Sequence, residues 1–111
     1  MVPLKTALAA VLIAMAICPV RAESGIAAFY GGGRTASGEV TGPKGFTAAH
    51  RTLPFGTKVV VTHVRSGKTV VVRITDRGPY GRGRIIDLSR AAAVELGMIE
   101  SGTAMVSIER Q

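Results

Sequence analysis

The sequence contains little cysteine, histidine or aromatic residue. Its 111 residues include one cysteine, Cys18, two histidines, five aromatic residues and no tryptophan. A single cysteine forms no disulfide within the chain, and two distant histidines without further cysteines lack the ligand spacing of a zinc site. We therefore expect neither a disulfide framework nor a metal, and the fold must be held by its core alone.

Sequence motifs for two other kinds of chemistry are also absent. There is no nucleophile elbow of the kind that presents the serine of a Ser-His-Asp hydrolase. The glycines at 31–33 are not followed by the Gly-Lys-Ser/Thr of a phosphate-binding loop. Internal repeats and low-complexity linkers are lacking, and the chain length supports one domain.

Acidic residues are half as frequent as basic ones, with 7 Asp and Glu against 14 Lys and Arg. A basic surface favours a polyanion or an anionic surface as partner. Because the basic residues are scattered and aromatic residues are few, we expect no nucleic-acid binding and favour an acidic cell envelope. A basic surface that serves only solubility is the alternative.

The N-terminal 22 residues have the pattern of a secretory signal peptide. Lys5 supplies a positive start, 7–17 is an uncharged apolar run, and small or branched residues precede a cut after Ala22. The run is shorter than the roughly 20 residues of a membrane span. An uncleaved anchor and a lipid on Cys18 are disfavoured alternatives, the latter because Ile17 precedes the cysteine. We expect an exported, unanchored monomer formed by 23–111.

After residue 22 the pattern predicts short strands, close turns and one short helix. Two β-branched runs, 57–64 and 69–75, flank a turn and give the strongest signal, that of a hairpin. The helix starts at a Ser89 cap and stops at Gly97. The other expected strands are 25–30, 46–50, 84–88 and 104–109. Since the helix is too short to cover a sheet, a closed β-barrel is the favoured architecture.

Among the seven carboxylates, Asp76 and Glu39 are the candidates for chemistry. Asp76 follows the strand 69–75 at a Gly-Pro turn, where it is either a turn former or a catalytic group. Glu39 lies in a polar loop and is either solvated or functional. We expect Asp87 to stabilise the helix N-terminus. We also expect the remaining acids to be solvated, namely Glu23, Glu95, Glu100 and Glu109.

His50 ends the apolar run 46–50, whereas His63 lies on a strand and has no evident role. One or two carboxylates with a histidine nearby favour acid–base chemistry on a polar substrate, with a sugar as the natural choice.

The chain resembles the RlpA-like (rare lipoprotein A) family in a series of segments that occur in order. They are GIAAFYGG, TASGE, FTAAHRTLPFGTKVVVT, SGKTVVVRITDRGPYGRGRIIDLSRAAAVELGM and GTAMVSIE. The resemblance extends over 25–109. It implies a six-stranded double-psi β-barrel and the activity of an endolytic peptidoglycan lytic transglycosylase, which cleaves glycan strands between N-acetylmuramic acid and N-acetylglucosamine and leaves 1,6-anhydro ends.

The same resemblance implies a cleft formed by Glu39, His50 and Asp76. Asp76 would be the acid–base residue, Glu39 the second carboxylate, and His50 a group that orients or polarises the site. Peptide-free glycan would be the preferred substrate, and no cofactor or metal would be needed. Substrate contacts would come from Tyr30, Thr35, Arg77 and Tyr80. The alternative is a non-catalytic, expansin-like module that binds or loosens the wall, favoured by the short segment 31–34.

Overall fold

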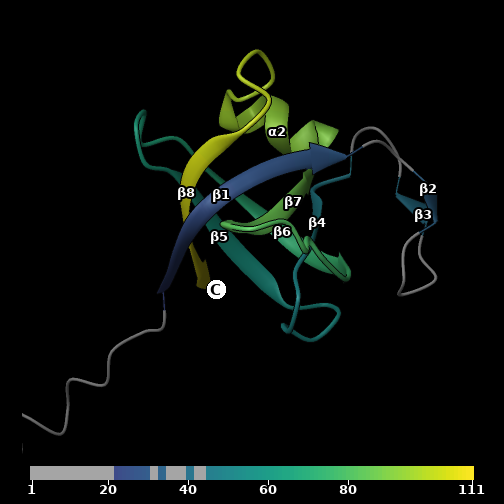
Figure 1. Ribbon diagram of the computed structural model, residues 1–111. Coiled ribbons are helices and arrows are strands. Elements are labelled where there is room, and N and C mark those ends of the chain that lie inside the picture. The colour runs from purple at the N-terminus through teal and green to yellow at the C-terminus, as the bar shows by residue number, and fades with distance from the viewer. Residues whose placement is uncertain (1–21, 31–32, 35–39, 42–44) are drawn as a thin grey trace, which may run out of the picture.

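A barrel of six strands, closed at one end by a helix, forms the body of the protein (Figure 1). The computed structural model describes residues 22–30, 33–34, 40–41 and 45–111. The barrel strands are β1 (Ala22–Tyr30), β4 (Thr47–Ala49), β5 (Lys58–His63), β6 (Thr69–Asp76), β7 (Arg84–Ser89) and β8 (Ala104–Arg110). A separate pair consists of β2 (Gly33–Arg34) and β3 (Val40–Thr41), and the helix is α2 (Arg90–Leu96).

The strands close in the order β1-β7-β4-β6-β5-β8. Two of the six neighbouring pairs, β1–β7 and β4–β6, are parallel, and the others are antiparallel. A closed six-stranded barrel with two such parallel pairs is the double-psi topology, so the predicted fold class is confirmed. The hairpin of β5 and β6 is also confirmed.

The core is made by the inward-facing half of each strand. Val59 and Val61 of β5 are fully buried and pack with Val72 and Ile74 of β6. This alternation has the period of two that places one face of a strand inside a barrel. Hydrophobic residues of α2 join the same core, namely Ala92, Ala93 and Leu96.

Helix α2 begins where the sequence predicted. Ser89 Oγ accepts a hydrogen bond from the Ala92 N–H, and Gly97 adopts the left-handed conformation at the helix C-terminus. Ser89 Oγ also accepts from the Thr47 N–H at 3.2 Å and donates to the Gly45 carbonyl oxygen. One buried hydroxyl therefore fixes the start of both the helix and β4.

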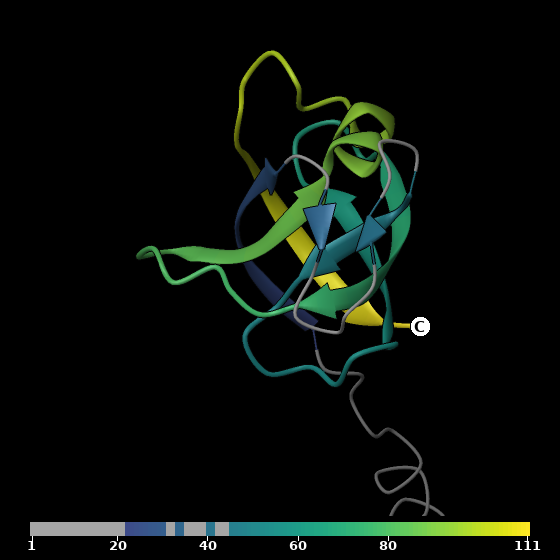
Figure 2. The ribbon, with the colours of Figure 1, turned by 90° about the vertical axis from the view of Figure 1, so that its right-hand side faces the viewer.

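The pair β2–β3 stands outside the barrel, on the side where β4 lies (Figures 1 and 2). Between β2 and β3 the sequence contains Thr35 and Glu39, which lie outside the described residues. The expected signal peptide lies outside them as well, apart from Ala22, at which β1 begins.

Candidate functional site

Two carboxylates flank Ala49, the last residue of β4. Asp76 of β6 and Asp87 of β7 are both registered opposite Ala49 of β4, and Asp87 is also registered opposite Ala28 of β1. These four residues, Asp76, Ala49, Asp87 and Ala28, form what we call the carboxylate row. With neighbouring strands about 4.8 Å apart, the Cα atoms of the two aspartates are about 10 Å apart.

The row lies on the outer face of the barrel. Ala27, Ala48 and Leu88, the neighbours along the strands, belong to the core, whereas Ala28 and Ala49 are buried but are not part of that core. Both aspartates are partly exposed. Ala49, which lies between the two aspartates, has only a methyl side chain and is itself buried.

A β-bulge brings Asp76 into the row. The pairing of β4 with β6 shifts between Ala48 and Ala49, so that Ile74 opposes Ala48 and Asp76 opposes Ala49. Thr75, the skipped residue, is buried, and its hydroxyl has no partner among the described residues. Bulges often re-aim a side chain beside an active site. Without this one, Thr75 rather than Asp76 would be registered opposite Ala49.

Asp87 is the carboxylate whose chemistry is most changed by its surroundings. Its Oδ1 is buried and has no hydrogen-bond partner in the described part of the chain. Burial raises the pKa of Asp87 above its usual 3.8, and the positive charge of Arg84 opposes that rise. A raised pKa keeps a carboxyl group protonated to higher pH, and a group with an unused oxygen is suited to donate that proton.

Asp76 is held in place by its own strand end. Its Oδ1 accepts a hydrogen bond from the Arg77 N–H at 2.8 Å. The Arg77 guanidinium donates to the carbonyl oxygens of His50 at 3.2 Å and Leu53 at 2.7 Å. It also lies over the ring of Phe55, 4.2 Å from the centroid. Arg77 thus fastens the turn after Asp76 to the loop after β4.

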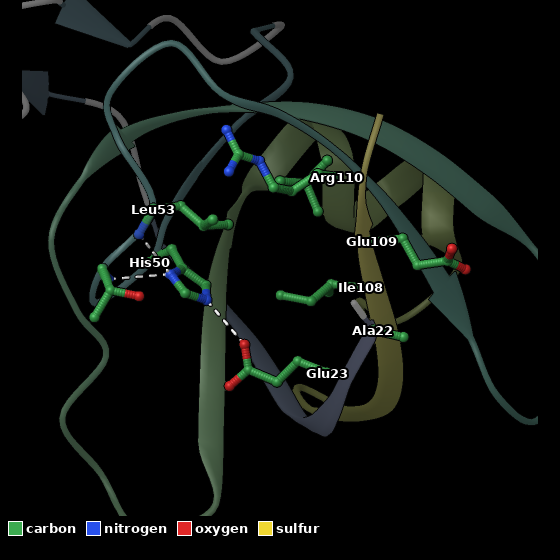
Figure 3. Close-up of a pocket in the computed structure, with 9 residues that line it drawn as sticks. Ala22, Glu23, His50, Leu53, Ile108, Glu109 and Arg110 are labelled. Carbon is green, nitrogen blue, oxygen red and sulfur yellow. Dashed lines mark hydrogen bonds and ion pairs between the residues drawn. The ribbon is translucent and has the colours of Figure 1, made fainter. Parts of the chain in front are cut away.

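The imidazole of His50 points into a pocket of about 450 Å³, at the end of the barrel away from α2 (Figures 1 and 3). Its Nε2 is 3.0 Å from Glu23 Oε1, and its Nδ1 accepts hydrogen bonds from the Thr52 and Leu53 N–H groups. Val59 and Ile108 of the core also line this pocket. The ring therefore faces the inside of the barrel end, whereas the carboxylate row lies on the outer wall.

The comparison with protein families identifies the family to which this barrel belongs. The sequence model of the family described as lytic transglycolase matches residues 22–108. The chain belongs to the lytic transglycolase family. The match begins at the first residue of β1 and ends within β8, so it includes part or all of every barrel strand.

Curated relatives carry the same family barrel within longer chains. A probable endolytic peptidoglycan transglycosylase RlpA of Nostoc is 60% identical over 91 residues, which are 77% of this chain and 24% of the relative. The endolytic peptidoglycan transglycosylase RlpA of Pasteurella multocida is 52% identical over 92 residues, 79% of this chain and 31% of the relative. The chain thus spans about a quarter to a third of the length of these relatives.

Solved structures share the barrel fold at low sequence identity. Streptomyces papain inhibitor superposes with a TM-score of 0.66 at 23% identity, covering 85% of this chain and 98% of the inhibitor. A Clavibacter michiganensis expansin in complex with cellohexaose gives 0.64 at 22% identity, covering 82% of this chain and 50% of the expansin. At such identities the likeness concerns the fold.

The predicted site residues are brought together only in part. His50 adjoins Asp76 through the backbone, since its N–H donates to the Asp76 carbonyl oxygen at 3.1 Å, but its ring points elsewhere. Glu39 and Thr35 are outside the described residues. Tyr80 is 78% exposed on the loop after Asp76. The Tyr30 hydroxyl is engaged with Thr47 Oγ1 at 3.0 Å, joining the ends of β1 and β4.

Two expectations about acids are wrong. Asp87 does not tie the helix N-terminus, because Ser89 caps the helix and Asp87 Oδ1 is left without a partner in the described structure. Glu23 is not merely solvated, because it pairs with His50. A signal for Asp87 was present in the sequence: it alternates with the core residues Ile86 and Leu88, which places it on the outer face. The Glu23–His50 pair spans 27 residues and has no local signal.

The described residues hold no cluster of three or more His, Cys, Asp or Glu side chains arranged to bind a metal ion. None of the helices in the described ranges is both long and apolar enough to cross a membrane.

Proposed function

We propose that this protein is an endolytic lytic transglycosylase that cleaves peptidoglycan glycan strands at the carboxylate row. The observation that carries the proposal is the pairing of Asp87, whose Oδ1 is buried and without a partner in the described residues, with a second aspartate across a small alanine. Two carboxyl groups on either side of a glycosidic bond are the standard apparatus for breaking it. The named activity of the RlpA relatives supports the same reaction.

Asp87 is the proton donor in this proposal. The bond between C1 of N-acetylmuramic acid and O4 of N-acetylglucosamine breaks as Asp87 gives its proton to O4. The raised pKa of Asp87 keeps this proton available to higher pH than an ordinary aspartate would. The first choice from the sequence was Asp76, and the burial and unpaired oxygen of Asp87 are what favour the reassignment.

Asp76 accepts the proton of the second step. The C6 hydroxyl oxygen of the same muramic acid attacks C1 and closes the 1,6-anhydro ring, and its proton passes to Asp76. No water is consumed, and exchange with solvent returns Asp87 to its protonated and Asp76 to its ionised state. Glu39, which directly precedes β3 in the sequence, would assist as a further carboxylate, as the resemblance to the RlpA-like family implies.

The preferred substrate would be glycan freed of stem peptides, as the resemblance to the RlpA-like family implies. Tyr80, which is largely exposed beside Asp76, would contact a sugar face. We further propose an exported location in the cell envelope, supported by the signal-peptide pattern up to Ala22 and by the basic net charge.

Digestion of amidase-treated peptidoglycan tests the function. Purified protein is expected to release sugars that end in 1,6-anhydro-muramic acid, which mass spectrometry distinguishes from hydrolysed reducing ends by the mass of one water. Reducing ends without anhydro ends would indicate a hydrolase. Binding to sacculi without any new ends would favour a wall-binding module instead, and either result would refute the proposal.

A further inference from the structure

The pocket at the barrel end contains a hydrogen-bonded glutamate–histidine pair that the proposed chemistry does not use. Glu23 and His50 face each other across this pocket, Oε1 to Nε2 at 3.0 Å (Figure 3). The His50 side chain is only 8% exposed, whereas that of Glu23 is 48% exposed. Glu23 is the second residue of β1 and is registered opposite Ile108 of β8.

Every hydrogen-bonding position of the His50 ring is occupied. Nδ1 accepts from two backbone N–H groups, those of Thr52 and Leu53, both at 3.1 Å. Nδ1 therefore carries no proton in this arrangement, and Nε2 donates its own proton to Glu23 Oε1. A ring with both nitrogens engaged is fixed in orientation, and it has no nitrogen left for a substrate.

The two peptide groups of His50 hold the end of β6, where Asp76 lies. The His50 N–H donates to the Asp76 carbonyl oxygen at 3.1 Å, and the His50 carbonyl oxygen accepts from the Arg77 guanidinium at 3.2 Å. The Arg77 N–H in turn donates to the Asp76 carboxylate. Three consecutive links thus lead from Glu23, through His50, to the group that takes the proton.

We propose that Glu23 is a positioning residue: by holding the His50 ring it sets the backbone that places the Asp76 carboxylate. This inference rests on the proposed function. Glu23 touches no substrate. It acts through two intervening residues, and its contribution is to the geometry of the chemical step, for which displacements of about 1 Å are costly.

The kinetics of three variants distinguish this positioning role from an effect of the Glu23 charge and from an effect of the pocket's shape. Glu23→Ala removes the acceptor of the His50 hydrogen bond, and Glu23→Gln keeps an acceptor oxygen without the charge. Glu109→Ala is the matched control, because Glu109 lines the same pocket and its side chain makes no hydrogen bond or ion pair in the described structure. We expect Glu23→Ala to lower kcat about tenfold at unchanged KM. Glu23→Gln should recover activity to within about twofold of the parent, and Glu109→Ala should have no effect.

Amide hydrogen exchange tests the linkage without any substrate. In Glu23→Ala the His50 amide, which donates to Asp76, should exchange about tenfold faster, while amides of β5 and β8 keep the parent rates. Glu23→Gln should restore protection.

The outcomes of the two measurements are distinct. Unchanged His50 exchange in Glu23→Ala would overturn the inference, and so would faster exchange across the whole barrel, which indicates general destabilisation. An inactive parent protein would refute the proposed function alone, and the exchange measurement would still decide whether Glu23 positions Asp76. If kcat is as low in Glu23→Gln as in Glu23→Ala, the charge of Glu23 and not its hydrogen bond supports catalysis. That result would also overturn the inference.

Discussion

The carboxylate row and the Glu23–His50 pair both adjoin the end of β4, yet they differ in how fully their polar atoms are bonded. In the row, Asp87 Oδ1 is buried and lacks a partner within the described residues. In the pair, both ring nitrogens of His50 are engaged. An unpaired buried oxygen costs stability, and a protein retains such a cost where it serves function.

The contrast also explains why the acid and the histidine receive different roles. A proton donor needs an oxygen that is not already engaged and a proton to give. Asp87 Oδ1 has no partner in the described residues, and burial raises the pKa of this carboxyl group above its usual value. The His50 ring has both nitrogens engaged, and the peptide groups of His50 contact Asp76 and Arg77. The following variants test this difference between the carboxylate row and the Glu23–His50 pair.

Asp87→Asn should have the largest effect. The amide has nearly the shape of the acid but no proton to give to the leaving oxygen, so release of anhydro ends should fall about a thousandfold. Sugar analysis by mass spectrometry measures the rate, and circular dichroism checks the fold. Parent-like activity in a folded Asp87→Asn protein would remove Asp87 from the chemistry.

Asp76→Asn should lower the rate about a hundredfold, because the C6 hydroxyl loses its proton acceptor. The backbone hydrogen bonds of residue 76 do not involve the carboxyl group, so the fold and glycan binding should persist. Binding to sacculi in a pull-down, measured beside the rate, shows whether the loss is in catalysis. Lost binding with the same catalytic rate would make Asp76 a substrate-binding residue instead.

Enlarging the residue between the aspartates should block the row. Ala49→Leu adds bulk on the outer face, where we expect a sugar ring, and should raise KM about tenfold or more. Val94→Leu, an enlargement on the exposed side of α2, is the matched control and should change neither KM nor stability. Equal KM values for Ala49→Leu and the parent would place the substrate elsewhere on the barrel.

Removing the ring of His50 should act mainly on stability. His50→Ala leaves the Thr52 and Leu53 N–H groups without their partner, and we expect the free energy of unfolding to fall by about 2 kcal/mol. Urea unfolding measures the change. A variant as stable as the parent but without activity would move His50 from the supporting network to the chemistry.

The smallest expected effect concerns stability and pH. Because the pKa of Asp87 is higher in the folded protein than the usual 3.8, folding takes up a proton there, and stability falls as pH rises from about 3.8 through the raised value. Asp87→Asn removes this loss, so its Tm should exceed that of the parent by about 1–3 °C at pH 7. The difference should shrink below pH 4, and the opposite trend would mean that the ionised form is the stabilised one.

The sequence predicted most of the fold because its signals are local. Alternating valines define β5 and β6, and the Ser89 cap and Gly97 define α2. Barrel closure and the parallel pairs depend on contacts between distant strands, and here the resemblance to a family supplied what local patterns lack.

The candidate site was predicted less completely. Asp76 could be identified because it ends a strand at a turn. Asp87 was misjudged because its proximity to Ser89 suggested a cap, whereas its environment depends on Ala28 and Ala49 of two other strands. Likewise, the role of Glu23 depends on a contact with a residue 27 positions away. Pairing across strands is a property of the closed barrel, and of these features only the alternation of Asp87 with Ile86 and Leu88 left a local signal.

A titration of the Asp87 carboxyl group by carbon NMR, run in parallel with the pH profile of kcat, tests the central claim most directly. The account predicts that Asp87 titrates above 3.8 and that kcat falls as pH rises through the same midpoint. An Asp87 that titrates at or below 3.8, or a kcat that does not follow its protonation, would contradict the claim that Asp87 is the proton donor of this site.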